Sequence, residues 1–133
     1  MTGKPDQNDS WDEKLSREFI DYGRYFIPER QHQIDIIVSL LPKPDTPIEV
    51  IELCCGEGHL AEAILDRNLT HTVLGFDGSN EMLLEANKRL TRFGPRFQSE
   101  KFELRDRSWR KKHSPVEAVD SSLAIHHLTG PEK

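Results

Sequence analysis

The sequence has 133 residues, 35% of them hydrophobic, and its 18 basic and 23 acidic side chains give a net charge of −5. This length suffices for one domain with one core, and the acidic balance gives no electrostatic case for binding nucleic acid. The densest basic cluster, residues 105–112, contains a single aromatic residue, Trp109, so we interpret it as a solvated loop. The chain also lacks an apolar run long enough to span a membrane, so we expect no membrane partner.

The N-terminal third is predicted to hold a tail and two helices. Residues 1–9 are almost wholly polar and predict a disordered tail. We expect a helical lead-in over residues 10–44. A capping box at Ser10–Glu13 would start the first helix, which runs towards Tyr22. The second helix should stop at Leu41, because two prolines follow closely.

The stretch around which the chain is organised begins at Ile48 and reads IEVIELCCGEGHLAEAILD. Its apolar start is typical of a buried parallel strand. Gly56 and Gly58 mark a tight turn where the backbone can approach a ligand closely. Apolar residues then recur at helical spacing towards Asn68. Strand, glycine turn and helix form the first unit of a nucleotide-binding α/β sheet, in which the ligand lies beyond the carboxyl ends of the strands.

The rest of the chain repeats this alternation, and we assign residues 45–133 to one Rossmann-like domain. The expected elements are a strand at 71–76 closed by Asp77, a helix at 81–90 capped by Ser79, a strand at 101–104 followed by Asp106, and a strand at 116–125. This order predicts a three-layer α/β sandwich with a mainly parallel sheet and right-handed crossovers.

Two adjacent cysteines, Cys54 and Cys55, cannot form a relaxed disulfide with each other, because neighbours on a strand face opposite ways. They indicate a reduced, cytoplasmic protein. The fourth strand should lie beside the first, so either thiol could approach His126 or His127 and offer zinc-type ligands. Adjacent pairs on one strand chelate poorly, so we expect no metal.

The turn Gly56–Ala61 satisfies G-x-G-x-x-A, a pattern that several cofactor classes share. Asp77, at the end of the second strand, can accept both hydroxyl hydrogens of a ribose, which indicates an adenosine-containing ligand. Glu57 in the turn and Glu52 before it would repel a pyrophosphate and suit the cationic end of S-adenosylmethionine. If Glu57 instead points to solvent and Glu52 only caps its strand, an NAD(P)-binding oxidoreductase domain stays open.

The chain resembles the class I S-adenosylmethionine-dependent methyltransferases. Four segments match in that family's order and spacing: VIELCCGEGHLAEAIL, VLGFDGSNEMLLEANKRL, FELRDRSW and EAVDSSLAIHHL. The resemblance implies the N-terminal half of that fold, preceded by two lead-in helices. It also implies transfer of a methyl group from S-adenosyl-L-methionine to an unidentified, small-molecule acceptor.

For the methionine and ribose portions of the cofactor, the resemblance implies the following roles. Glu52 would orient the amino group of the methionine. Gly56 and Gly58 would let the backbone touch the methionine and the ribose. Asp77 would hold the ribose hydroxyls, with Gly78–Ser79 beside it.

The resemblance also implies residues at the adenine and at the reactive methyl group. Met82 would pack near the adenine. Asp106 would accept from the adenine amino group, and the backbone N–H of Arg107 would face the ring. Ser122 and His126 would line the floor under the methyl group. His126 could also take a proton from the acceptor; the alternative is that it only forms a pocket wall.

Three features depart from the family pattern. Cys54 replaces the first glycine of the turn, and Asp120 replaces an apolar residue of the fourth strand, where a carboxylate without a partner is costly. The sequence also stops just after the fourth strand. We therefore expect a fragment of a longer reading frame or a non-catalytic cofactor-binding part that acts with a partner. The fourth strand would then be an exposed edge that favours self-association.

Overall fold

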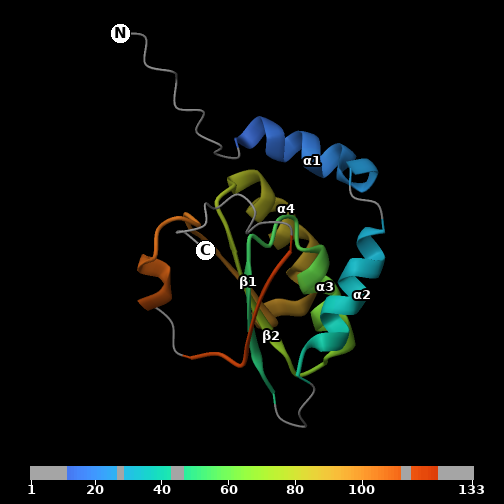
Figure 1. Ribbon diagram of the computed structural model, residues 1–133, viewed down its shortest axis with the longest axis vertical. Coiled ribbons are helices and arrows are strands. Elements are labelled where there is room, and N and C mark those ends of the chain that lie inside the picture. The colour runs from blue at the N-terminus through green and yellow to red at the C-terminus, as the bar shows by residue number, and fades with distance from the viewer. Residues whose placement is uncertain (1–11, 27–28, 43–46, 112–114, 123–133) are drawn as a thin grey trace.

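The computed structural model describes residues 12–26, 29–42, 47–111 and 115–122. Two helices precede four strands that alternate with helices along the chain (Figure 1). The helices are α1 (Glu13–Phe26), α2 (Arg30–Leu40), α3 (His59–Arg67) and α4 (Asn80–Leu90), and the strands are β1 (Glu49–Leu53), β2 (Thr72–Asp77), β3 (Phe97–Lys101) and β4 (Ala118–Ser121). Short 3-10 helices, η1 (Thr91–Arg96) and η2 (Ser108–Lys111), flank β3. Within these described ranges, no helix combines the length and the apolar character that crossing a membrane requires.

The strands form one parallel sheet in the order β3-β2-β1-β4. Leu53, the last residue of β1, pairs with Phe76 of β2 on one side and with Ser121 of β4 on the other. The carboxyl ends of the three strands are therefore level with one another, and side chains that follow them meet at one edge. The predicted Rossmann-like parallel sheet is confirmed.

The core lies between the sheet and the helices α3 and α4, with α2 packed beside α3. Val38 of α2, Leu60 and Ile64 of α3 and Leu90 of α4 meet Val50 of β1, and each is at most 2% exposed. Burying a side chain of this size is worth about 1.5–3 kcal/mol. This packing fixes where the start of α3 lies relative to the strand ends.

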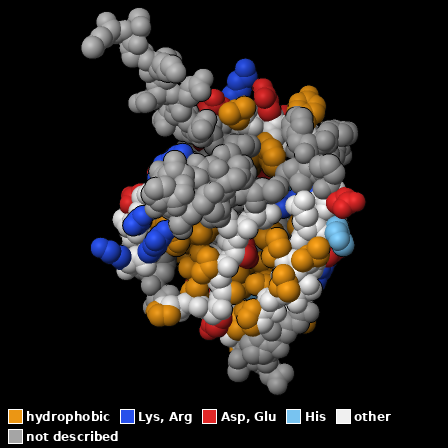
Figure 2. Space-filling view, viewed as in Figure 1, with side chains coloured by type: hydrophobic (Ala, Val, Ile, Leu, Met, Phe, Trp, Pro, Cys, Tyr) orange, Lys and Arg blue, Asp and Glu red, His pale blue; other side chains and the backbone are white. Residues whose placement is uncertain are grey.

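The described residues cover the opposite face of the sheet less completely. Near the carboxyl end of β2, Phe76 packs against Phe102 and Trp109. Towards the edge strand, Val119 is 57% exposed. Figure 2 shows hydrophobic side chains gathered over the middle of the viewed face, where Figure 1 places the sheet.

Three predicted boundaries need correction. The third strand occupies Phe97–Lys101 instead of residues 101–104, because Phe97 is buried against the core and β3 takes its register from β2. The first helix continues beyond Tyr22 to Phe26. The fourth strand begins at Ala118, and residues 123–125 of its predicted range lie outside the described residues.

The start of α1 also differs from the predicted capping box. Asp12 is the cap, because its Oδ1 accepts the Leu15 backbone N–H at 2.7 Å; Ser10 lies outside the described residues. Glu13 turns away from its own helix to the start of α4. Its carboxylate accepts from the Ser79 hydroxyl at 3.0 Å and from the backbone N–H groups of Asn80 and Glu81 at 2.8 and 3.0 Å.

Glu13 therefore caps α4 from another helix and fixes α1 beside the carboxyl end of β2. The hydrogen bond from the Glu81 backbone N–H, followed by a smaller opposing effect of burial and by the bonds from Asn80 and Ser79, lowers the pKa of Glu13.

We predict that Glu13→Gln destabilises the protein by about 0.5–1 kcal/mol at neutral pH, because α4 loses a charged cap. The effect is small because solvent screens the exposed Glu13 charge. The lowered pKa sets the sign of the pH dependence. The stabilisation by Glu13 is present above the ordinary pKa of a glutamate and is lost as the pH falls through the folded-state value. Urea unfolding of the unchanged chain and of Glu13→Gln, at neutral and at acid pH, measures the difference in their free energy of unfolding. Glu18→Gln on the same helix is the control, and a difference that persists at acid pH would contradict the cap.

Candidate functional site

The turn between β1 and α3 uses backbone conformations that favour glycine. Cys54, Gly56 and Gly58 have φ angles of 56°, 57° and 89°. A Cβ on Gly58 would lie 2.9 Å from Leu90 Cδ1 and 3.4 Å from Ala86 Cα, so a side chain there would displace the Leu90 side chain and crowd the backbone of α4. The glycines therefore serve the tight turn, as predicted, and Gly58 also permits the close approach of α4, which the sequence did not indicate. Cys54 holds a conformation that costs a residue with a Cβ about 1–2 kcal/mol.

The backbone donors of this turn already have acceptors within the protein. The N–H of Cys55 donates to the Phe76 carbonyl at 2.9 Å, and that of Gly58 to the Cys55 carbonyl at 3.1 Å. The N–H of Gly56 donates to Asp77 Oδ2 at 2.9 Å. A turn that binds a pyrophosphate offers such N–H groups to the ligand. These three are engaged elsewhere, which disfavours a dinucleotide.

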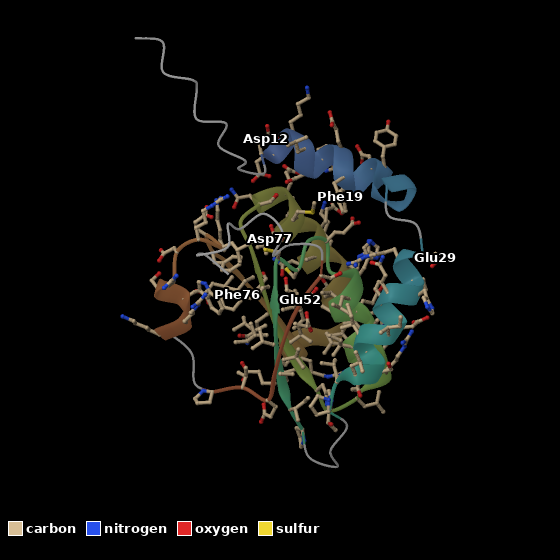
Figure 3. All side chains as sticks on the ribbon, in the orientation of Figure 1. Asp12, Phe19, Glu29, Glu52, Phe76 and Asp77 are labelled. Carbon is tan, nitrogen blue, oxygen red and sulfur yellow. The ribbon has the colours of Figure 1, made fainter. Side chains whose placement is uncertain are left out.

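Asp77 ends β2 with its carboxylate turned towards the glycine turn (Figure 3). Its Oδ1 accepts the Ser79 N–H at 2.9 Å, while its Oδ2 accepts from Gly56. The side chain is nearly buried, which raises its pKa, and the hydrogen bonds from Ser79 and Gly56 oppose that rise. Each carboxylate oxygen has lone pairs left for further donors. The structure thus brings the predicted ribose-binding carboxylate and the glycine turn together.

Ser79 and Met82 support this arrangement from α4. The Ser79 hydroxyl caps the helix by accepting the Met82 N–H at 3.1 Å, as the sequence predicted. Met82 is 4% exposed, and its sulfur lies 3.9 Å from the point that a Cβ on Gly56 would occupy. Met82 therefore packs beneath the turn.

A cavity of about 360 Å³ opens beyond Asp77, within the range of about 300–1,000 Å³ that small-molecule sites occupy. Its described lining is Gly78, Glu100, Lys101, Phe102, Glu103, Asp106, Ser108 and Trp109. The Asp106 carboxylate accepts the N–H and the hydroxyl of Ser108 at 2.9 and 3.0 Å, so its position is fixed. Two predicted residues, Gly78 and Asp106, therefore share this cavity; Arg107 is exposed next to Asp106.

The sequence interpretation missed Trp109. Its ring lies 5.5 Å from Phe76 and 5.7 Å from Phe102, measured between centroids. The basic residues around Trp109 are exposed, as predicted for a solvated loop, but the ring itself forms a wall of the cavity. An aromatic residue within a basic loop was the available signal.

Glu52 and Asp120 form a second group of charges, on β1 and β4. They are direct partners in the parallel register, and Glu52 is 2% exposed. Within the described part of the chain, Glu52 Oε2 and both Asp120 carboxylate oxygens are buried without a hydrogen-bond partner. Burial, and then the neighbouring Asp120, raise the pKa of Glu52 well above its ordinary value. Burial raises the pKa of Asp120 to about 7.

Arg30, at the start of α2, faces this group and was also missed from the sequence, which gives no signal for it. Its Nη1 donates to the Ser122 hydroxyl at 2.6 Å, so Ser122 is held at the end of β4. Burial lowers the pKa of Arg30, while Glu52 and Glu57 oppose that change.

Glu57 contributes less to the charge of the site than the sequence suggested. Its Oε1 lies 2.7 Å from His59 Nε2, and its Oε2 lies 4.0 Å from Arg89 Nη2. The charge of Glu57 is thus partly compensated on the outer side of the turn. The electrostatic preference for a cationic ligand therefore depends on Glu52.

The described residues contain no cluster of three or more potential metal ligands. Cys54 and Cys55 are free thiols, and burial raises the pKa of both, that of Cys54 to about 12. His126, the predicted catalytic residue, and His127 lie outside the described residues.

Comparison with known proteins identifies a family. A family model described as "Methyltransferase domain" matches residues 50–133. A trans-aconitate 2-methyltransferase of Variovorax paradoxus (strain S110) is 26% identical over 124 residues, which cover 92% of this chain and 42% of that protein.

Two solved structures share the fold. The methyltransferase domain of bacterial CtHen1-C is 26% identical, with a TM-score of 0.64 over 77% of this chain and 54% of that one. A Methanococcus maripaludis protein, provisionally described as an S-adenosyl-L-methionine-dependent methyltransferase, is 16% identical, with a TM-score of 0.69 over 96% of this chain and 57% of that one. The chain therefore spans 42–57% of the length of these relatives.

We predict that Cys54→Gly is more stable than Cys54→Ala by about 1 kcal/mol. Both variants lack the thiol, and only alanine keeps a Cβ at the left-handed φ of 56°. Thermal or urea unfolding measures the difference. The same pair at Cys55, where φ is not positive, should rank in the opposite order; alanine matching glycine at position 54 would refute the strain.

We predict that Asp120→Val stabilises the protein by about 1–3 kcal/mol above neutral pH, because it removes a buried carboxylate that lacks a partner. The raised pKa sets the sign. The contribution of Asp120 to stability is fully present below its ordinary pKa and is lost as the pH rises through about 7, so the advantage of valine grows over that interval. Urea unfolding across this pH range measures it, with the exposed Glu117→Gln as control. A valine variant that is less stable than the unchanged chain at alkaline pH would contradict this account.

Proposed function

The chain belongs to the family of methyltransferase domains, and we propose that it binds S-adenosyl-L-methionine at the carboxyl ends of β1 and β2. The bound cofactor supplies a methyl group on a positively charged sulfur. The chain's own task is to bind and orient the cofactor and to exclude water. No covalent intermediate with the protein is needed.

One observation carries this proposal: the Asp77 carboxylate and the glycine turn are joined by the hydrogen bond to the Gly56 N–H. This contact places an acceptor for ribose hydroxyls next to a turn whose backbone can approach the ligand closely. The cavity beside Gly78 and Asp106 continues from the same point, so the adenine would extend into it.

The roles of the individual residues at the ribose and adenine are part of the proposal. Asp77 would accept the ribose hydroxyls, with Gly78 and Ser79 beside it. Asp106 would accept from the adenine amino group, and the Arg107 backbone N–H would face the ring. The fixed Asp106 carboxylate and the aromatic wall of the cavity support this orientation.

At the methionine end, Gly56 and Gly58 would let the backbone approach the ligand, and Met82 would support the turn from below. Glu52 would bind the amino group, since its buried Oε2 has no partner in the described part of the chain. Ser122, held by Arg30, would lie near the methyl group.

An NAD(P)-binding oxidoreductase domain is not favoured. Its pyrophosphate would meet a turn in which the N–H groups of Cys55, Gly56 and Gly58 already donate to protein acceptors. The buried carboxylate of Glu52 would also repel it.

We propose a small molecule as the methyl acceptor. The support is the trans-aconitate 2-methyltransferase relative, whose name gives a small organic acid as its acceptor. His126 is proposed to take the acceptor's proton. Whole relatives are about twice as long as this chain, so turnover by the chain is itself part of the proposal.

We predict that S-adenosylhomocysteine binds the chain in isothermal titration calorimetry and that Asp77→Asn weakens this binding by about tenfold or more, because the ribose loses a charged acceptor. Asp66→Asn, a surface change that leaves the site intact, should bind as the unchanged chain does. Circular dichroism checks that both variants are folded. Tight binding of a nicotinamide dinucleotide in place of S-adenosylhomocysteine would overturn the proposal.

A further inference from the structure

The pairing of β1 with β4 brings two carboxylates face to face. Glu52 and Asp120 are register partners on neighbouring parallel strands, which lie about 4.8 Å apart. Partners in this register point to the same side of the sheet. Val50 and Ala118, two residues earlier on each strand, face the helix side and its core, so both carboxylates face that side too.

Among the described residues, neither carboxylate forms an ion pair. Glu52 Oε2 and both Asp120 oxygens are buried and without hydrogen-bond partners in the described part of the chain. Leaving one buried charge without a partner is costly, and leaving two side by side is more so. A proton retained by the pair would relieve this cost, and the pKa of both groups is shifted upwards, as such retention requires.

Among the described residues, two charged groups from other elements act on Glu52, and a third acts on Arg30. Arg30 of α2 attracts Glu52, and its Nη1 donates to the hydroxyl of Ser122, just after β4. Asp77 of β2 repels Glu52, and Glu57 in the turn acts on Arg30. Among these described groups, the carboxylates therefore outnumber the one cation.

We propose that Asp120 is a ligand-binding residue, and that Glu52 and Asp120 together bind the amino group of the cofactor's methionine portion and release their shared proton as it enters. This inference rests on the proposed function and adds a residue that the family resemblance treats as an anomaly. A primary ammonium group has three N–H donors, enough to serve both carboxylates.

The step balances without covalent chemistry. Before binding, the pair carries one proton and a net charge of −1. After binding, both carboxylates are ionised, the ammonium donates hydrogen bonds to them, and the displaced proton goes to solvent. Uptake of the cationic group and loss of the proton leave the total charge of the pocket unchanged.

Calorimetry of the unchanged chain directly tests whether a proton is released when the ligand binds. S-adenosylhomocysteine is titrated slightly below neutral pH in buffers that differ in ionisation enthalpy, and the dependence of the observed heat on the buffer gives the number of protons released. We expect about one proton per ligand. Methylthioadenosine, which keeps the adenosine and the sulfur but lacks the amino acid portion, should bind with no proton release.

Variants then assign the effect to Asp120. Asp120→Val should lower the affinity for S-adenosylhomocysteine by about tenfold and reduce the number of protons released on binding. The affinity for methylthioadenosine should change by no more than about twofold. Glu117→Gln changes an exposed residue just before β4, and it should leave both affinities and the proton release as they are in the unchanged chain.

The outcomes separate this inference from the function on which it rests. Binding of S-adenosylhomocysteine with no proton release, or with the same affinity and release in Asp120→Val, would overturn the role of Asp120 and leave the cofactor site standing. Failure of both adenosine ligands to bind the unchanged chain would overturn the cofactor site and this inference together.

Discussion

The hydrogen bond from the Gly56 N–H to the Asp77 carboxylate holds the ends of two neighbouring strands in one arrangement, and the rest of the site depends on it. Parallel pairing alone makes the strand ends level. The hydrogen bond fixes the turn that follows β1 against Asp77, the last residue of β2. Asp77 also accepts from Ser79, whose hydroxyl binds Glu13, so α1 is tied to the same point.

The two ends of the site differ in how their charges are satisfied. At the end proposed to bind the ribose, Asp77 is buried but hydrogen-bonded to backbone N–H groups, which keeps a carboxylate in place at moderate cost. At the end proposed to bind the methionine portion, Glu52 Oε2 and both Asp120 carboxylate oxygens are buried and without hydrogen-bond partners in the described part of the chain. Asp77 has its hydrogen bonds satisfied within the protein and can hold the turn in place. The buried carboxylates of Glu52 and Asp120 destabilise the protein while they lack partners, and a cationic ligand would remove that destabilisation.

Most of the fold followed from sequence because its signals are local. The apolar run before Gly56 and the acid at Asp77 predicted the strands, the turn and the carboxylate that faces it. The signals that failed depend on contacts distant in sequence: β3 starts at Phe97 because the core buries that ring, and Glu13 caps a helix more than 60 residues away. Asp120 was visible as an anomaly, but only the register with Glu52 shows what it faces.

The most direct test of the central claim is a crystal structure of the chain with S-adenosylhomocysteine bound. If Asp77 holds the ribose, the ribose hydroxyls will lie on the Asp77 carboxylate, the adenine will lie in the cavity beside Asp106, and the glycine turn will keep its present conformation. A ligand whose ribose lies away from Asp77, or a glycine turn that opens to bind a phosphate through its N–H groups, would contradict it.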